Sequence, residues 1–300
     1  MIRSGFVSII GLPNSGKSTY LNAVLKENIA ITSRKPQTTR RNLKGIYNDD
    51  DSQIVFVDTP GVNTGKAMLD KYMAKSVLSS LSDIDLLMIM IDVNTYKVDK
   101  FDKLISVIRK SSAPKVIIIN KIDAYEGDID VAKEEIKIIF SDVSEIKEIF
   151  CISALKKKNI KEVIVELKKY LKDNCRYYDT EFLTDEPTKK IVADMIRQQC
   201  LYKLDKEVPH SIEVVVESMK TSKLKCMQIE ALIVCDKEAH KKIIIGKNGV
   251  MIKNIGIGSR ISIEKFLDEK VNLKLNVIVK ENWRNEKTKL INFGYDIDNI

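Results

Sequence analysis

A glycine-rich motif close to the start of the sequence has the composition of a phosphate-binding loop. Residues 11–18 read GLPNSGKS, which fits G-x-x-x-x-G-K-[ST], and they follow an apolar run at 6–10. Glycine lets the backbone curl so that its N–H groups surround phosphates at a helix N-terminus. We expect Lys17 to reach the β- and γ-phosphates and Ser18 to hold magnesium. The predicted nucleotide contacts in this loop are Gly11, Pro13, Asn14, Ser15, Gly16, Lys17, Ser18 and Thr19.

A second motif, Asp-Thr-Pro-Gly at 58–61, comes directly after the apolar run at 54–57. Parallel strands end at one common edge of a sheet, so Asp58 should emerge beside the phosphate loop. There its carboxylate can hold the magnesium shell, and the Gly61 N–H can sense the γ-phosphate. Without the phosphate loop this motif would be an ordinary turn. With it, we predict nucleotide contacts at Asp58, Thr59, Pro60, Gly61 and Val62.

A third motif identifies the base. Asn-Lys-Ile-Asp at 120–123 follows the apolar run at 116–119. The Asp123 carboxylate can accept both N–H groups of a guanine edge, which adenine does not offer. A Ser-Ala-Leu triplet at 153–155 would place a backbone N–H on the guanine carbonyl. The predicted guanine contacts are Asn120, Lys121, Asp123, Ser153, Ala154 and Leu155, and the predicted ligands are GTP and GDP.

Two adjacent threonines stand between the first two motifs, in the segment QTTRR at 37–41. In a nucleotide switch, a threonine of this loop binds magnesium only when the γ-phosphate is present. The sequence does not decide between the two threonines. We take Ser18, Thr39 and Asp58 as the Mg²⁺ ligands, and the predicted catalytic residues are Lys17, Thr38, Thr39, Asp58 and Gly61.

The motifs together predict GTP hydrolysis by in-line attack of water, driven by positioning and charge stabilisation. Ras-like proteins orient that water with a glutamine after the Asp-x-x-Gly motif, whereas here Val62 follows Gly61. We therefore expect slow intrinsic turnover that another group or a partner stimulates. One candidate is a potassium ion bound through the side-chain oxygen of Asn14, and the alternative is that Asn14 is an ordinary turn residue.

The order of apolar runs and helical stretches predicts two domains. Short apolar runs alternate with polar helical stretches in the first half, which indicates an α/β P-loop GTPase domain with a mostly parallel six-stranded sheet covered by helices on both faces. The second half reads helix, strand, strand, helix, turn, helix, strand, the order of a smaller α+β type II KH domain. We assign 1–172 to the GTP-binding domain, 173–187 to a linker, 188–282 to the KH domain and 283–300 to a tail.

A basic turn in the second half is a candidate nucleic-acid contact. Five lysines and one acid stand in 237–253, around the Gly-x-x-Gly turn at 246–249. Such a turn between helices is common without any ligand, but in KH modules it brings the backbone against a nucleic-acid strand. The predicted RNA-binding residues are Lys237, Lys241, Lys242, Ile245, Gly246, Lys247, Asn248, Gly249, Ile252 and Lys253.

The composition of the chain limits which classes of protein it can belong to. The chain has 300 residues, a net charge of +8 and 44% hydrophobic residues, as in a globular protein with an anionic partner. Its longest apolar run, 86–91, is too short to span a bilayer, and the early phosphate loop leaves no room for a signal peptide, so we expect a cytoplasmic protein. The five cysteines include no C-x-x-C pair, which favours reduced thiols over a zinc site.

Two other functional classes are compatible with parts of the sequence. An RNA-modifying or metabolic enzyme would need a second catalytic constellation after residue 187, where the histidines are isolated and no carboxylate pair or cysteine motif stands out. A membrane-surface protein could use the basic 237–253 segment to bind anionic lipid. RNA binding distinguishes these classes from a GTPase switch that acts on RNA.

From residue 5 to 295 the chain resembles the Era family of bacterial ribosome-assembly GTPases. The likeness includes ITSRKPQTTR at 31–40, EVPHS at 207–211, and an ending with NWR at 282–284 and GY at 294–295. The resemblance implies a monomer whose KH domain binds the 3′ end of 16S rRNA in the 30S ribosomal subunit precursor. It also implies that GTP favours RNA binding, that RNA stimulates hydrolysis, and that a fraction associates peripherally with the inner membrane. The family typically lacks the Ras-like glutamine, in agreement with Val62.

Overall fold

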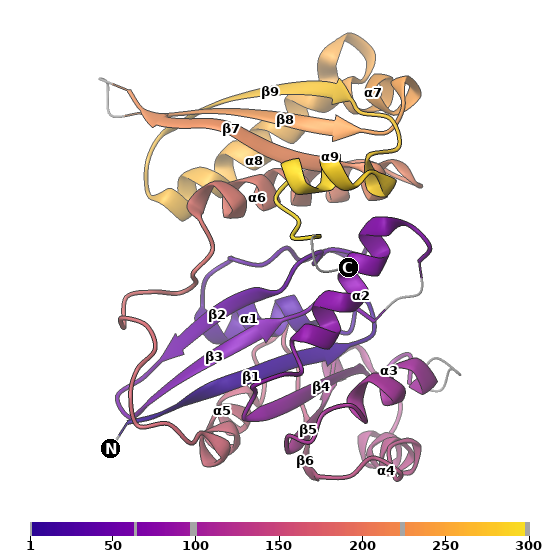
Figure 1. The fold of residues 1–300 in the computed structure, drawn as a ribbon, viewed down its shortest axis with the longest axis vertical. Helices are drawn as coiled ribbons and strands as arrows, with labels where there is room; N and C mark the ends of the chain where they lie inside the picture. The colour runs from indigo at the N-terminus through magenta and orange to yellow at the C-terminus, as the bar shows by residue number, and fades with distance from the viewer. Residues whose placement is uncertain (1, 63–64, 97–100, 223–225, 298–300) are drawn as a thin grey trace. The chain divides into compact units, whose positions relative to one another are not determined.

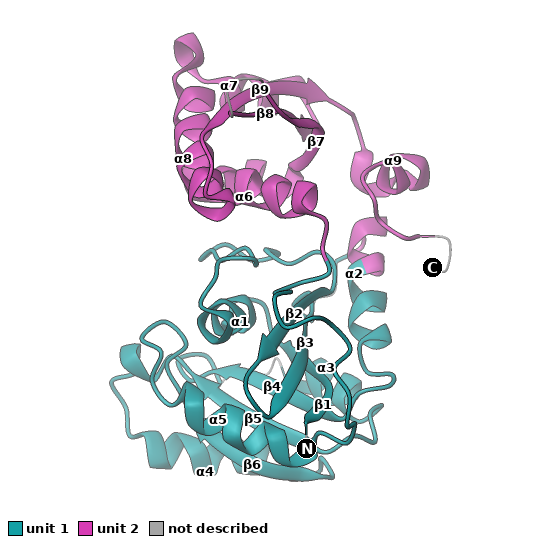
Figure 2. Ribbon diagram, turned by 90° about the vertical axis from the view of Figure 1, so that its left-hand side faces the viewer, with its two compact units in different colours: residues 1–65, 73–185 teal, residues 66–72, 186–300 magenta. Residues whose placement is uncertain are grey.

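The chain divides into two compact units in a computed structural model (Figures 1 and 2). The structure describes residues 2–62, 65–96, 101–222 and 226–297, so the last three residues of the predicted tail lie outside it. Unit 1 comprises Met1–Gly65 and Met73–Asp185, and unit 2 comprises Lys66–Tyr72 and Glu186–Ile300. The second boundary falls between residues 185 and 186, so most of the segment that we assigned to the linker belongs to unit 1.

Unit 1 contains a six-stranded sheet in the order β2-β3-β1-β4-β5-β6. Only β2 is antiparallel to its neighbour, because a short turn joins it to β3. The predicted mostly parallel sheet is confirmed, with the strand ends shifted by a few residues. The strands are β1 (Arg3–Gly11), β2 (Leu43–Asn48), β3 (Ser52–Asp58), β4 (Leu86–Asp92), β5 (Lys115–Asn120) and β6 (Ile146–Cys151).

Helices cover both faces of this sheet, as Figure 1 shows. The central strand β4 is therefore buried along 86–91, where no residue exceeds 1% exposure. This burial explains why the central strands appear in the sequence as unbroken apolar runs, and why polar side chains gather where the strands end. The helices are α1 (Lys17–Leu25), α2 (Met68–Ser79), whose first turn is grouped with unit 2, α3 (Phe101–Ile108), α4 (Ile129–Ile139) and α5 (Ile160–Leu167).

Residues 173–185, which we call the strap, run along the β2 edge of the sheet. The Gln53 side chain accepts hydrogen bonds from the Tyr177 and Tyr178 N–H groups and donates one to the Tyr178 carbonyl. The Ile46 N–H donates to the Leu183 carbonyl at 2.8 Å. These bonds fix the strap to unit 1 and cover part of an edge strand, which would otherwise present unpaired backbone groups.

Unit 2 has the predicted order of elements, with a three-stranded sheet in the order β7-β8-β9. Strand β8 pairs antiparallel with β7 and parallel with β9. The first strand starts at Glu213, directly after Ile212 and a 3-10 turn at Val208–Ser211 that contains Pro209. The elements are α6 (Thr188–Lys203), β7 (Glu213–Thr221), β8 (Met227–Cys235), α7 (Glu238–Ile245), α8 (Val250–Leu267) and β9 (Val271–Val279).

The tail forms two further elements, a 3-10 turn at Trp283–Asn285 and helix α9 (Lys287–Asn292). Trp283 and Leu290 are fully buried, and the Trp283 Nε1–H donates to the Ser211 carbonyl at 2.9 Å. The Tyr295 hydroxyl donates to the buried Glu213 carboxylate. The tail is thus part of the packed core of unit 2.

Within the described ranges, no helix is long and apolar enough to cross a bilayer. All five cysteines carry free thiols. No cluster of three or more metal-binding His, Cys, Asp or Glu side chains occurs among the described residues.

Candidate functional site

The phosphate loop joins the end of β1 to the start of α1, and its lysine is buried. Lys17 Nζ donates to the carbonyls of Gly11 at 3.3 Å and Leu12 at 3.2 Å. Burial lowers the pKa of Lys17 to about 8, while the nearby Asp58 carboxylate acts in the opposite direction. A phosphate at the loop would favour the charged ammonium. The loop therefore holds a buried cation ready for an anionic ligand.

Two residues of the loop adopt left-handed backbone conformations, Asn14 at φ 63° and Gly16 at φ 102°. A Cβ at Gly16 would lie 2.1 Å from Asn120 Nδ2, so no side chain fits at this position. The requirement for glycine is therefore both conformational and steric.

Three side-chain oxygens converge next to the lysine. The Ser18 hydroxyl donates to Asp58 Oδ2 at 2.7 Å, and the Thr39 hydroxyl donates to the same oxygen at 3.2 Å. The two hydroxyl oxygens lie 3.0 Å apart. The structure thus brings Thr39 to Ser18 and Asp58, the predicted magnesium ligands.

The Asp58 carboxylate has an unused oxygen. Asp58 is fully buried, and its Oδ1 has no hydrogen-bond partner within the described chain. Burial raises the pKa of Asp58, while Lys17 and the two hydroxyls oppose that shift. Magnesium prefers hard oxygen ligands and usually takes one or two carboxylates from a protein, so this oxygen set fits Mg²⁺.

The segment after β3 lies against the phosphate loop. The Thr59 hydroxyl donates to the Ile9 carbonyl at 2.8 Å, and the Val62 N–H donates to the Gly11 carbonyl at 3.2 Å. A Cβ at Gly61 would lie 2.8 Å from the Cα of Pro13. The Val62 side chain packs against the hydrophobic core and has no group that could orient a water molecule.

Asn120 connects the loops around the predicted guanine position. Its Nδ2 donates to the Ser15 carbonyl at 2.9 Å, and its Oδ1 accepts from the Ala154 N–H at 2.9 Å. Both ends of the amide are therefore used to join the phosphate loop to the Ser-Ala-Leu loop. Asn120 supports the base site through these loops.

Lys121 has a partner that the sequence analysis missed. Its Nζ lies 2.6 Å from Asp92 Oδ2, and its backbone is left-handed at φ 69°. Asp92 is the last residue of β4, at the same carboxyl edge as the predicted motifs. That position was the available signal, since an acid at the end of a central strand points to the site.

The remaining predicted guanine residues combine a buried serine, Ser153, with exposed residues at 123 and 155. The Ser153 hydroxyl donates to Asp123 Oδ1 at 2.5 Å, and it accepts from the Lys156 N–H at 3.0 Å. Asp123 is exposed, and Leu155 is 70% exposed. The serine holds the carboxylate in place and leaves its second oxygen for a ligand.

In unit 2, the predicted RNA-binding turn connects α7 to α8. Gly246 and Gly249 have φ values of 74° and 75°, and Asn248 between them is also left-handed at 50°. A Cβ at Gly246 would lie 2.7 Å from the Met251 Cβ. The turn therefore needs glycine at 246 for space and at both positions for conformation.

The lysines around this turn are available to a ligand. None of the five forms an ion pair with a described residue, and all are exposed or half-buried. Ile245 and Ile252 are half-buried and pack against the core below the turn. The structure thus gathers the predicted set at one end of unit 2: Lys237, Lys241, Lys242, Ile245, Gly246, Lys247, Asn248, Gly249, Ile252 and Lys253.

The fold and site define a P-loop GTPase joined to a KH domain. Residues 6–121 match the family model described as 50S ribosome-binding GTPase, and residues 207–284 match the model of the KH domain. The GTPase Era of Clostridium kluyveri is 43% identical over 98% of this chain and 100% of its own length. That of Clostridioides difficile is 41% identical over 99% of both chains. The chain belongs to the Era family of GTPases.

Two solved Era structures have the same fold as this chain over nearly its whole length. An Aquifex aeolicus Era variant bound to GDP and AlF4⁻ has a TM-score of 0.93, at 33% identity over 98% of this chain and 99% of its own. Era in complex with MgGDPNP and nucleotides 1506–1542 of 16S ribosomal RNA has a TM-score of 0.94, with the same identity and coverage. The predicted family and fold are confirmed, and the chain is an enzyme that binds and hydrolyses GTP.

Proposed function

We propose that this GTPase is a switch that binds the 3′ end of 16S rRNA and assists maturation of the 30S ribosomal subunit. The observation that carries the proposal is the Gly246–Gly249 turn. Five lysines that form no ion pair with a described residue surround this turn, and its two glycines leave the backbone free of side chains at both positions. An Era relative has been solved with a fragment of 16S ribosomal RNA, and this chain aligns with 98% coverage. Single-stranded RNA fits such a turn because its phosphates can approach the backbone closely.

The GTPase half would act as the timer of RNA binding. Thr39 reaches Asp58 and Ser18 from a loop that precedes β2, so a γ-phosphate with magnesium would hold that loop in place. Lys17 would neutralise charge on the β- and γ-phosphates, and the Gly61 N–H would face the γ-phosphate. The Val62 side chain has no polar group that could activate water. The proposed intrinsic rate of GTP hydrolysis is therefore slow, and bound RNA would raise it. A high basal rate of the isolated protein in sodium buffer would contradict this.

The decisive experiment measures GTP hydrolysis with and without an oligonucleotide of the 16S rRNA 3′ end. We expect stimulation in the wild-type protein, and none with Lys247→Asp combined with Asn248→Asp. A matched control, Lys206→Asp with Thr188→Asp, makes the same charge change at exposed positions of unit 2 outside the turn. Equal RNA affinity of the turn variant and the wild-type protein in a filter assay would refute the KH assignment.

Potassium is the proposed stimulating cation at the phosphate loop. Asn14 Nδ2 donates to the Arg34 carbonyl at 2.9 Å, which leaves the amide oxygen for a cation. A monovalent cation there would supply positive charge where other GTPases use an arginine. Hydrolysis rates in potassium chloride and sodium chloride test the idea, and Asn14→Ala should remove the difference. Equal rates in the two salts would remove potassium from the mechanism.

Location and assembly state are proposed on family grounds: a cytoplasmic monomer, a fraction of which associates peripherally with the inner membrane. The lysines of 237–253 could also meet anionic lipid. Cosedimentation with vesicles that contain phosphatidylglycerol tests membrane association, with the Lys247→Asp and Asn248→Asp variant as the comparison. If the protein binds the RNA oligonucleotide more tightly than the vesicles, the result would support RNA binding as its main role.

A further inference from the structure

The strap carries an acidic and aromatic surface that neither GTP hydrolysis nor RNA binding uses. Residues 173–185 contain four acids and one basic residue, Arg176, in a chain whose net charge is +8. Phe182 is 51% exposed, Tyr177 41% and Leu183 36%. An exposed group of large apolar side chains within an acidic segment is characteristic of an interaction surface.

The strap is ordered by its contacts with the sheet. The Tyr177 ring packs on Phe6 at 4.8 Å between centroids, and Arg176 Nη2 donates to the Asp49 carbonyl at 2.9 Å. At its other end, Asp185 accepts from Lys44 Nζ at 2.8 Å and from the Tyr178 hydroxyl at 3.0 Å. A surface that is already ordered loses less conformational entropy when a partner binds.

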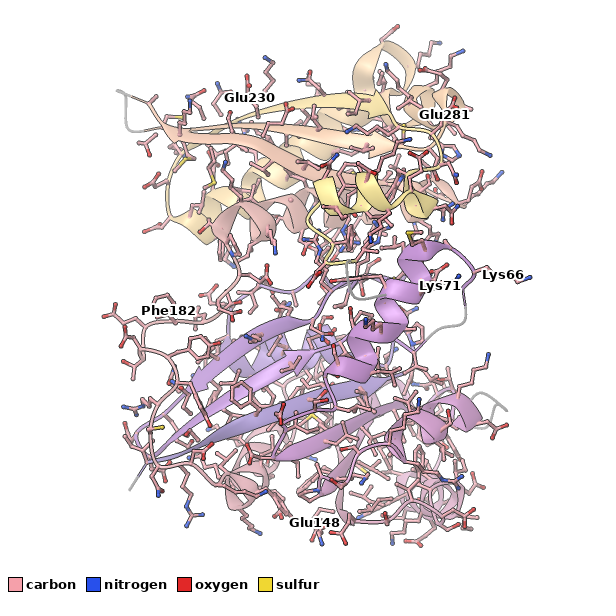
Figure 3. The ribbon with its side chains drawn as sticks, in the orientation of Figure 1. Lys66, Lys71, Glu148, Phe182, Glu230 and Glu281 are labelled. Carbon is pink, nitrogen blue, oxygen red and sulfur yellow. The ribbon has the colours of Figure 1, made fainter. Side chains whose placement is uncertain are left out.

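Between these anchors, the strap borders a hollow that is open to solvent. Residues 176–182 line a space of about 720 Å³, large enough for several side chains of a ligand. Three of the seven lining residues are aromatic and two are acidic. The carboxylates of Asp179 and Glu181 have no hydrogen-bond or ion-pair partner among the described residues. Phe182 is labelled on the strap in Figure 3.

Carboxylates next to aromatic rings form an environment that binds ammonium and guanidinium groups. The carboxylates attract the charge, and a ring face adds a cation–π contribution of about 0.5–2 kcal/mol. The same acids repel the phosphates of RNA, so the strap is unsuited to the proposed RNA ligand. We propose that the strap is a docking surface for an extended lysine- and arginine-rich peptide segment of a partner protein.

A peptide-binding experiment tests this proposal. The probe is a fluorescein-labelled peptide KLRKLRKG, and the reference peptide has glutamine at every lysine and arginine. Anisotropy of each is measured with the full chain in the GDP state at 0.15 M salt. We expect saturable binding of the cationic peptide alone. Asp179→Lys with Glu181→Lys should weaken that binding at least about tenfold, because both unpaired carboxylates are reversed.

A matched variant separates a local site from general charge attraction. Asp142→Lys with Glu148→Lys makes the same charge change at and just before β6, the opposite edge of the sheet from β2. Glu148 is labelled in Figure 3. We expect this variant to bind the peptide within about twofold of the wild-type protein, since screening limits exposed charges to about 8 Å. Phe182→Ala should weaken binding about fivefold through loss of the ring.

Three outcomes would overturn the docking surface. They are no binding of the cationic peptide to the wild-type protein, equal weakening in both charge-reversed variants, or full affinity in Phe182→Ala. RNA binding is measured in parallel with the 16S oligonucleotide, and the strap variants should retain it. If the wild-type protein binds RNA but not the cationic peptide, the docking surface is refuted and the proposed function stands. If the wild-type protein does not bind RNA, the proposed function is refuted and the docking surface is unaffected.

Discussion

The Asn120 side chain donates a 2.9 Å hydrogen bond to the Ser15 carbonyl, 105 residues earlier in the chain. Its other end accepts from the Ala154 N–H, so one amide joins the phosphate loop to the guanine loop. Asn120 is 2% exposed. The position of the base relative to the phosphates therefore depends on one buried side chain.

Asn120→Ala should weaken GTP and GDP binding together. Two buried hydrogen bonds at about 1–1.5 kcal/mol each correspond to roughly 30- to 150-fold in affinity. Titration of a fluorescent GDP analogue measures the change. Asn174→Ala, at an exposed asparagine, is the control and should leave affinity unchanged. Affinity of Asn120→Ala within about threefold of the wild-type protein would show that the loops hold their positions without this amide.

Thr39 and Thr38 should differ in their effect on magnesium. The Thr39 hydroxyl contacts the Ser18 hydroxyl and the Asp58 carboxylate, which makes Thr39 the expected ligand of the two. Thr39→Val should raise the Mg²⁺ concentration for half-maximal GTP hydrolysis about tenfold or more, because a ligand worth about 1.4 kcal/mol is lost. Thr38→Val should change it less than about twofold. GDP affinity is the internal control for both variants. Similar magnesium dependence in the two variants would argue against Thr39 as the ligand.

The buried lysine predicts a pH dependence of GTP binding. Burial lowers the pKa of Lys17 to about 8, below its usual value of 10.5. A bound triphosphate favours the charged lysine, so its pKa rises in the complex. Below pH 8 Lys17 is already charged in the free protein. Above pH 8, GTP binding takes up a proton, so the dissociation constant for GTP should rise with pH and approach about a tenfold increase per pH unit.

Calorimetry between pH 7.5 and 9 measures this linkage. Titrations in two buffers with different ionisation enthalpies should give different binding enthalpies above pH 8, because a proton is taken up from the buffer. Lys17→Gln should bind more weakly and lack this uptake. A dissociation constant that stays level from pH 7.5 to 9 in the wild-type protein would mean that the lysine is fully charged before GTP arrives.

The sequence predicted the parts of the site that depend on local pattern. Lys17, Asp58 and Asp123 belong to motifs that follow apolar runs, so strand geometry places these motifs at one edge of the sheet. The choice between two adjacent loop threonines depends on no such pattern, and the contacts of Thr39 with Ser18 and Asp58 come from the folded structure. Asp92 lies 29 residues before its partner Lys121, and a short sequence motif does not predict an ion pair between residues so far apart in the chain.

The contacts of the strap and of the tail were also beyond what the sequence predicts. Gln53 bonds to a backbone 124 and 125 residues later, and Ser211 meets Trp283 at a separation of 72 residues. A polar segment without periodicity favours the interpretation of a linker, and the contacts that order it arise only from the folded sheet. Local sequence reasoning therefore identified the chemistry and the order of elements, while tertiary contacts decided which loops are fixed.

The single tryptophan of the chain should be a main contributor to the stability of unit 2. Trp283 is fully buried and donates to the Ser211 carbonyl, and the Ser211 hydroxyl is 2.9 Å from His240 Nδ1 on α7. Trp283→Ala should lower the free energy of unfolding by about 3–5 kcal/mol through the cavity that it leaves. Trp283→Phe fills most of that space and should cost about 1–3 kcal/mol, since the Ser211 carbonyl loses its donor.

Ile291→Ala is the control, because this residue of α9 is 41% exposed and should cost less than about 1 kcal/mol. Denaturant unfolding followed by circular dichroism compares the three variants with the wild-type protein. Graded losses in the order Ala, Phe, control would establish the tail as part of the folded KH unit. If all three variants unfolded at the same denaturant concentration as the wild-type protein, the tail would contribute nothing to that unit, and the buried tryptophan would need another explanation.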